Sequence, residues 1–151
     1  MRYLPIKSVT KKFAFSKDEV INLILDIDKY KEFLPWCKNS YIVEKKENDL
    51  IKNISANLEI GYKQFADTYT SLVILDKNKS EISVKHLNGP LKKLNNIWKF
   101  KELSKKSCEV NFYIEIELDN FILNKIFEKF FNTGFEKIFL AFQDRAEKKL
   151  K

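Results

Sequence analysis

Residues 121–142 decide the fold; they read FILNKIFEKFFNTGFEKIFLAF and hold seven of the thirteen phenylalanines of the chain. At about 100° per residue on a helix, the apolar side chains fall in one arc of about 220°: Phe121, Leu123, Ile126, Phe127, Phe130, Phe131, Phe135, Ile138, Phe139 and Phe142. A surface helix needs an apolar stripe of only about 100°. We therefore expect a long helix over residues 120–151 that packs inside a strongly curved sheet or lines an apolar space.

The preceding sequence predicts that sheet. Strict alternation of apolar and polar residues makes 107–118 the clearest strand, and 54–60 repeats the pattern. Further strands are expected at 8–15, 41–46, 65–75, 81–87 and 97–103. Short polar turns between them favour an antiparallel meander that curves.

Two short helices are expected after the first strand. Ser16 and Glu19 have the spacing of a capping box, and a second helix over residues 29–33 should stop before Pro35. The order of elements predicts one α+β domain over residues 1–151. Its fold is a helix-grip, a curved antiparallel sheet wrapped around the C-terminal helix.

Composition narrows the class of protein. The chain has 151 residues, enough for one domain with a sizeable core. No run approaches the roughly 18 apolar residues of a membrane span, and residues 1–7 lack the apolar segment of a secretory signal. Cys37 and Cys108 fit no metal spacing and indicate reduced, buried thiols in an intracellular protein.

The net charge of +7 raises the question of an anionic partner. Only Arg2 and Arg145 are arginines among the 28 basic residues, whereas base readout favours arginine. DNA is therefore not an expected partner. Dispersed lysines favour a solvating surface, with weak attraction to anionic lipid headgroups as the alternative.

The sequence does not predict a catalytic or a metal site. It has one histidine, His86, and lacks a nucleophile elbow and a glycine-rich phosphate loop. The carboxylate pairs Asp26/Asp28 and Glu115/Glu117 are expected to be solvated at the surface. We therefore expect a protein that is not an enzyme.

Some residues allow both a structural and a ligand-binding role. His86 shares strand parity with Ile82 and Val84, so it is either a hydrogen-bonded histidine at the core margin or a polar contact to a ligand. Asp67 and Tyr69 share strand parity with Phe65 and Val73, so either of these two roles is also open to them, although the indication of a ligand contact is weaker. The bulky segment 33–37 either plugs one end of the core or forms the entrance to an apolar space.

Several blocks of sequence, in order, resemble the coenzyme Q-binding START-like family. FLPWCKNS at 33–40 is similar to the family stretch F-x-P-W-C-x-x-S, and FLAFQDRA at 139–146 is similar to its A-F-x-x-R-A signature. Residues 58–62, 67–71 and 88–100 look like further family blocks. The resemblance covers nearly the whole chain.

The resemblance implies a helix-grip fold with a hydrophobic tunnel and a non-enzymatic lipid chaperone that binds ubiquinone and supports respiratory electron transport. A related bacterial branch, the ribosome-association toxins, implies the alternative of a translation inhibitor that binds the large ribosomal subunit and blocks subunit joining. A small-ligand enzyme resembling the aromatic cyclases is a third alternative. The chain looks bacterial or already trimmed of a mitochondrial presequence, and cytoplasmic with peripheral contact to the anionic inner membrane.

On this hypothesis ubiquinone (coenzyme Q) is the bound lipid, and burial of its isoprenoid tail needs no dedicated polar site. The expected tunnel walls are Leu58, Ile60, Phe65, Tyr69, Trp98, Phe100, Phe112, Phe127, Phe130, Phe131 and Ile138. The expected tunnel mouth consists of Phe33, Pro35, Trp36 and Leu91, and His86 is the expected polar contact.

Overall fold

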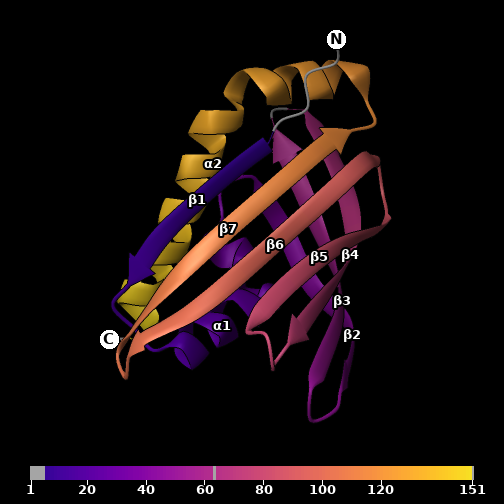
Figure 1. Cartoon of the computed structure of the whole chain (residues 1–151). Coiled ribbons are helices and arrows are strands. Elements are labelled where there is room, and N and C mark those ends of the chain that lie inside the picture. The colour runs from indigo at the N-terminus through magenta and orange to yellow at the C-terminus, as the bar shows by residue number, and fades with distance from the viewer. Residues whose placement is uncertain (1–5, 63, 151) are drawn as a thin grey trace.

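A computed structural model of the chain describes residues 6–62 and 64–150, with side chains at all of these positions except Tyr62, Phe65, Leu123, Phe127, Phe130 and Asn132. Its elements follow the predicted order (Figure 1). They are β1 (Ile6–Phe13), α1 (Lys17–Leu25), the 3-10 helix η1 (Ile27–Glu32), β2 (Cys37–Glu47), β3 (Ile51–Tyr62), β4 (Phe65–Asp76), β5 (Glu81–Asn88), β6 (Leu91–Ser104), β7 (Ser107–Leu118) and α2 (Phe121–Lys149).

The strands form one seven-stranded antiparallel sheet in the order β1-β7-β6-β5-β4-β3-β2. Strands β2 to β7 are a meander, and β1 returns to pair with β7, where Phe13 lies opposite Cys108. Figure 1 shows the first turns of α2 across the end of the sheet where β7 ends, and the rest of the helix behind β1 and β7. The predicted helix-grip fold is confirmed.

Helix α1 begins at the predicted capping box. The hydroxyl of Ser16 accepts a hydrogen bond from the backbone N–H of Glu19 at 3.2 Å, and the Glu19 carboxylate accepts one from the Ser16 N–H at 3.3 Å. The first turn of α1 is tied to the β4–β5 turn, because Lys17 donates to the Ser80 hydroxyl at 3.0 Å. The second short helix is a 3-10 helix that begins at Ile27, two residues before the predicted position.

The core lies between α2 and the inner face of the sheet. The buried residues of α2 recur every three or four positions, as expected of a helix packed along one face: Phe131, Phe135, Phe139, Phe142 and Ala146. Their rings contact aromatic residues of the strands. Ring centroids are 5.0 Å apart for Phe112 and Phe135, 5.4 Å for Trp98 and Phe142, and 5.9 Å for Phe13 and Phe139.

Two predictions about burial are wrong. Phe121 is not part of the buried arc; at the first position of α2 it is 74 % exposed. Glu115 and Glu117 are not solvated, since only 9 % and 6 % of their surface is exposed. Lysines of the neighbouring strand lie beside them, with Lys93 paired to Glu115. This pairing offsets the cost of burying a carboxylate.

Candidate functional site

The register of the sheet identifies the side chains that face α2. Leu58 lies opposite Tyr69, and Ser71 lies opposite His86. Directly paired residues point to the same side of a sheet, and these four share strand parity with core residues such as Ile54 and Ile82. The inner face is therefore mainly apolar, and Tyr69, Ser71 and His86 are among its polar groups.

On β3 to β7, burial on the inner face decreases toward one end of the sheet. On β3 the exposed fraction rises from 0 % at Ile54 to 37 % at Ile60. On β7, Val110 is fully buried, whereas Ile114 and Ile116 are half-buried. The inner face is thus closely packed near α1 and remains partly accessible toward the end of the sheet where β3, β5 and β7 end.

Four segments of the chain lie at this accessible end, which we call the rim and define as Trp36, Gly61, residues 89–91 and residues 118–121. The N–H of Gly61 donates to the carbonyl of Trp36 at 2.9 Å, and the N–H of Asp119 donates to the carbonyl of Pro90 at 2.8 Å. Gly89 has a φ of 120°, and a Cβ there would lie 2.8 Å from the carbonyl oxygen of Thr68. Only glycine suits that position.

Trp36 closes one side of the rim against α2. Its φ of 64° is left-handed, an uncommon conformation for a residue with a side chain. A Cβ at Gly134 would lie 3.3 Å from Cη2 of the indole, so the glycine allows the ring to approach the helix backbone. Leu91, half-buried and paired with Leu118, also lies at the rim, and Pro35 is half-buried next to Trp36.

Phe33 does not lie beside Trp36 at the rim. Its ring centroid is 5.4 Å from that of Phe142 and 5.9 Å from that of Tyr30, and the guanidinium of Arg145 lies over it at 4.9 Å. Phe142 is eight residues beyond Gly134, which is about 12 Å along a helix. The structure therefore places Phe33 in an aromatic cluster of the core, away from the rim.

The predicted wall residues divide into two groups. Trp98, Phe100, Phe112 and Phe131 are buried, and the first three pack within the core cluster, which explains their burial without a ligand. Leu58, Ile60, Tyr69 and Ile138 are more accessible. The side chains of Phe65, Phe127 and Phe130 lie outside the described residues. A wall role stays a prediction for all of them, and sequence reasoning missed Ile114 and Ile116, whose parity with Phe112 was the available signal.

The polar groups of the inner face lie close to the rim. Nε2 of His86 is 3.1 Å from the carbonyl oxygen of Gly89, and Nδ1 is buried without a hydrogen-bond partner among the described residues. Burial, with a smaller contribution from Asp67, raises the pKa of Tyr69 to about 12. Its hydroxyl therefore stays protonated near neutral pH. Ser71 is buried opposite His86; sequence reasoning missed it, although it shares parity with Tyr69.

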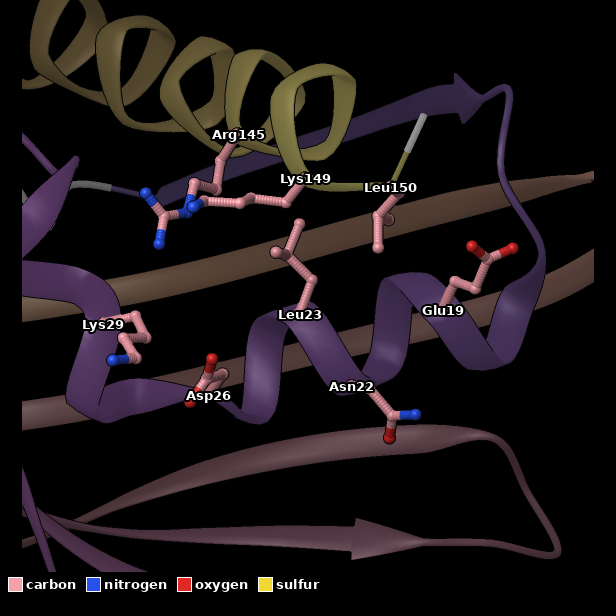
Figure 2. A pocket seen from close by; sticks show the side chains of 8 residues that line it. All are labelled: Glu19, Asn22, Leu23, Asp26, Lys29, Arg145, Lys149 and Leu150. Atoms are coloured by element: carbon pink, nitrogen blue, oxygen red, sulfur yellow. The ribbon is translucent and has the colours of Figure 1, made fainter.

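A hollow lies between α1 and the C-terminal end of α2 (Figure 2). It has a volume of about 390 Å³ and is lined by Glu19, Asn22, Leu23, Asp26, Lys29, Arg145, Lys149 and Leu150. Its walls carry both signs of charge and none of the predicted wall residues. The elements that line it, α1 and the end of α2, lie at the end of the sheet opposite the end of β7 (Figure 1).

The thiols and the acidic groups do not form a reactive centre in the part of the chain that the structure describes. Burial raises the pKa of Cys37, and it raises the pKa of Cys108 to about 11, so both thiols stay protonated and weakly nucleophilic. No three His, Cys, Asp or Glu side chains among residues 6–62 and 64–150 are grouped to hold a metal. In the same residues, neither α-helix is long and apolar enough to cross a membrane.

Comparison with known proteins identifies relatives of both branches. The model of the family described as polyketide cyclase/dehydrase and lipid transport matches residues 14–143. The chain is 30 % identical over 145 residues to the ribosome association toxin RatA of Rickettsia prowazekii, covering 94 % of this chain and 96 % of that protein. It is 35 % identical over 96 residues to the mitochondrial coenzyme Q-binding protein COQ10 of Dictyostelium discoideum, covering 64 % and 46 % of the two chains.

Solved structures share the fold. The Zhui aromatase/cyclase from Streptomyces sp. R1128 superposes with a TM-score of 0.77 at 16 % identity, over 99 % of this chain and 97 % of that one. An 18 kDa protein from Caulobacter crescentus superposes with a TM-score of 0.74 at 25 % identity, over 95 % and 97 % of the two chains. The likeness to the cyclase shows the fold alone.

Proposed function

Since the chain belongs to the polyketide cyclase/dehydrase and lipid transport family, we propose that it is a non-enzymatic carrier that binds an isoprenoid quinone between the sheet and α2. The observation that carries this proposal is the change in burial along the inner face, from fully buried Ile54 and Val110 to the accessible apolar residues near the rim. The identity to a coenzyme Q-binding protein supports the choice of ligand.

The energetics of such a site require little polar chemistry. Transfer of hydrocarbon from water contributes about 25 cal/mol per Å² of buried apolar surface. A prenyl tail placed against Leu58, Ile114 and Ile116 would cover apolar surface on both partners. Affinity would therefore come from the tail, and the ring of the quinone would remain near the rim.

The first test is identification of the bound lipid. Protein purified without detergent is extracted with organic solvent, and the extract is analysed by mass spectrometry. Recovery of a quinone or another prenyl lipid, together with saturable binding of an added short-chain ubiquinone, supports the proposal. Failure of both experiments contradicts it.

A pair of variants tests the location. Leu58→Gln places an amide on the inner face, whereas Glu59→Gln changes the next residue, which points to the outer face. The first variant should weaken quinone binding, while the second should bind like the wild type. Circular dichroism of both variants checks that the fold is retained. Equal affinities would place the ligand elsewhere.

We further propose that the rim meets a lipid surface when the carrier is loaded. Phe121 and Ile122 of α2 and Leu87 of β5 are 74 %, 62 % and 52 % exposed. Lys125 lies beside Phe121, with its Nζ 5.3 Å from the ring centroid, and the exposed Lys92 follows the rim residue Leu91. Apolar side chains among cations fit an interface of anionic lipids.

Vesicle sedimentation tests this contact. Vesicles that contain phosphatidylglycerol should retain the protein, and vesicles of phosphatidylcholine alone should retain much less. Replacement of Phe121 and Ile122 by serine should weaken retention, whereas Leu140→Ser, at an exposed position farther along α2, should not. Retention that is independent of these residues would contradict a membrane-facing rim.

A ribosome-associated inhibitor of translation is the second candidate. The observation that favours it is the identity to RatA over 96 % of that protein. Cosedimentation with ribosomal subunits should weaken steeply as salt increases, because lysine–phosphate contacts release counterions. If the protein does not sediment with subunits even at low salt, this candidate fails. That result does not bear on the proposal that the protein binds a quinone.

A further inference from the structure

The rim orients the single histidine of the chain through one ring nitrogen. Nε2 of His86 lies 3.1 Å from the carbonyl oxygen of Gly89. A carbonyl oxygen can only accept a hydrogen bond, so Nε2 carries the proton. In the neutral imidazole Nδ1 is then a bare acceptor, because only one of the two nitrogens is protonated.

The surroundings fix this arrangement. The backbone of Gly89 packs directly on β4, against the carbonyl oxygen of Thr68 and the side chain of Tyr69. The pairing of β4 and β5 places His86 opposite the buried Ser71. The carbonyl that orients the imidazole therefore belongs to a closely packed turn.

Nδ1 has no hydrogen-bond partner among the described residues and is buried. A buried acceptor without a partner is costly, and a ligand that donates a hydrogen bond to it removes that cost. His86 lies on the inner face, three residues before the rim and within the same accessible half as Leu58 and Ile60. The orphan acceptor thus lies on the face that the proposed site offers to the quinone, and a ligand reaches it once the atoms that cover it move aside.

We infer that Nδ1 of His86 selects ligands that present a hydroxyl donor, and that the carrier prefers the reduced hydroquinone to the quinone. This inference rests on the proposed function. The quinone offers only carbonyl oxygens, which face the lone pair of Nδ1 without a proton between them. The hydroquinone offers a phenolic O–H, which can donate to Nδ1.

The test compares three ligands with the same tail. They are a decyl-substituted dimethoxybenzoquinone, the hydroquinone made from it by chemical reduction and kept under argon, and the dimethyl ether of that hydroquinone. One hydrogen bond to a buried acceptor predicts that the hydroquinone binds about five- to tenfold more tightly than the other two. The dimethyl ether shows whether the donor itself, rather than the shape of the reduced ring, is responsible.

Variants of the histidine locate the effect. His86→Phe removes the acceptor and should reduce the preference to about onefold, whereas His86→Asn keeps an acceptor oxygen at the Nδ1 position and should retain part of it. Lys85→Gln changes the exposed neighbour on the outer face and should leave the preference unchanged. Circular dichroism and binding of the dimethyl ether report whether each variant keeps its fold and its apolar site.

The possible outcomes separate the two proposals. If none of the three ligands binds, the proposed function fails. If all three bind with equal affinity, if the quinone binds best, or if His86→Phe keeps the preference, the inference is wrong while the carrier proposal stands.

Discussion

Arg145 near the end of α2 stacks on Phe33, with its guanidinium carbon 4.9 Å from the ring centroid, and donates a hydrogen bond to the Glu32 carboxylate at 3.0 Å. The contact joins two sequence blocks that stand more than a hundred residues apart. Because Arg145 donates to it, the pKa of Glu32 lies below its ordinary value. The last helix is thereby fastened to the segment that leads to Trp36 and the rim.

Arg145→Lys should destabilise the protein although it keeps the charge. A lysine lacks the planar group that stacks on Phe33 and donates sideways to Glu32, and the cation–π contact contributes about 1 kcal/mol. Urea unfolding should show this loss, whereas Lys148→Gln, an exposed position of the same helix, should show almost none. Equal stability of both variants would mean that the stacking contributes nothing measurable.

The contact of Trp36 with Gly134 predicts a size limit at position 134. Gly134→Ala should gain about 1 kcal/mol of stability from the higher helix propensity of alanine. Part of this gain is lost because the new methyl group displaces the Trp36 indole, so the stability should stay near that of the wild type. Gly134→Leu should displace Trp36 and destabilise the protein. Adding Trp36→Ala to Gly134→Leu should recover stability, as measured by thermal unfolding. A wild-type melting temperature for Gly134→Leu alone would show that the contact is loose.

The ion pair of the exposed Lys93 with the buried Glu115 predicts a pH dependence of the stability. Hydrogen bonds from Lys93 and, more weakly, from the Tyr113 hydroxyl lower the pKa of Glu115 in the folded state. The pair therefore stabilises the fold above the unfolded pKa of about 4.3, and this stabilisation is lost as pH falls through the folded pKa. Glu115→Gln should be less stable than the wild type at pH 7 and similar to it at pH 3.

Urea titrations between pH 3 and pH 8 measure that difference. Lys93→Met should reproduce the effect, and the double variant should lose less than the sum of the two single variants, because they remove the same interaction. A stability difference that does not change with pH would rule out the ion pair as its source.

Trp98→Phe should lower the free energy of unfolding by more than the change in side-chain volume suggests. The indole N–H donates to Oδ1 of the buried Asn96 at 3.1 Å, while Nδ2 of Asn96 donates to the carbonyl of Tyr113 at 2.9 Å. Removing the indole donor leaves Oδ1 without that bond, at a cost of about 1–3 kcal/mol. Unfolding in urea measures it, and a loss below about 0.5 kcal/mol would mean that Asn96 finds another donor.

The sequence predicts the elements of this fold well where burial is periodic. The alternation from Cys108 to Val110 and Phe112 marks β7 over the residues where the structure has it. β6 begins at Leu91, six residues before the predicted start. The prediction missed this part of the strand because Lys92, Lys93 and Asn95 are exposed and the pairing has a register shift between Leu91 and Lys93, so apolar and polar residues do not alternate there. Local patterns thus reveal the strands whose two faces differ most.

The site is less predictable, because it depends on pairs that are distant in sequence. Parity indicates that His86 faces inward, but no pattern reveals that its Nε2 meets Gly89 while Nδ1 is left buried. Likewise, the charges of Glu115 and Glu117 suggest solvent exposure, and the lysines of the neighbouring strand, which no local pattern pairs with them, help to make their burial acceptable. The contact of Trp36 with Gly134 arises from tertiary packing alone.

The return of β1 to β7 has a consequence for the order of folding. Strands β2 to β7 pair with sequence neighbours, so their hairpins close short loops, whereas β1 must find its partner across about two thirds of the chain. Loop closure costs more entropy as the loop lengthens, and such long-range pairing slows folding. During synthesis β1 is made first but has to wait for β7, so the sheet acquires its last strand from the beginning of the chain.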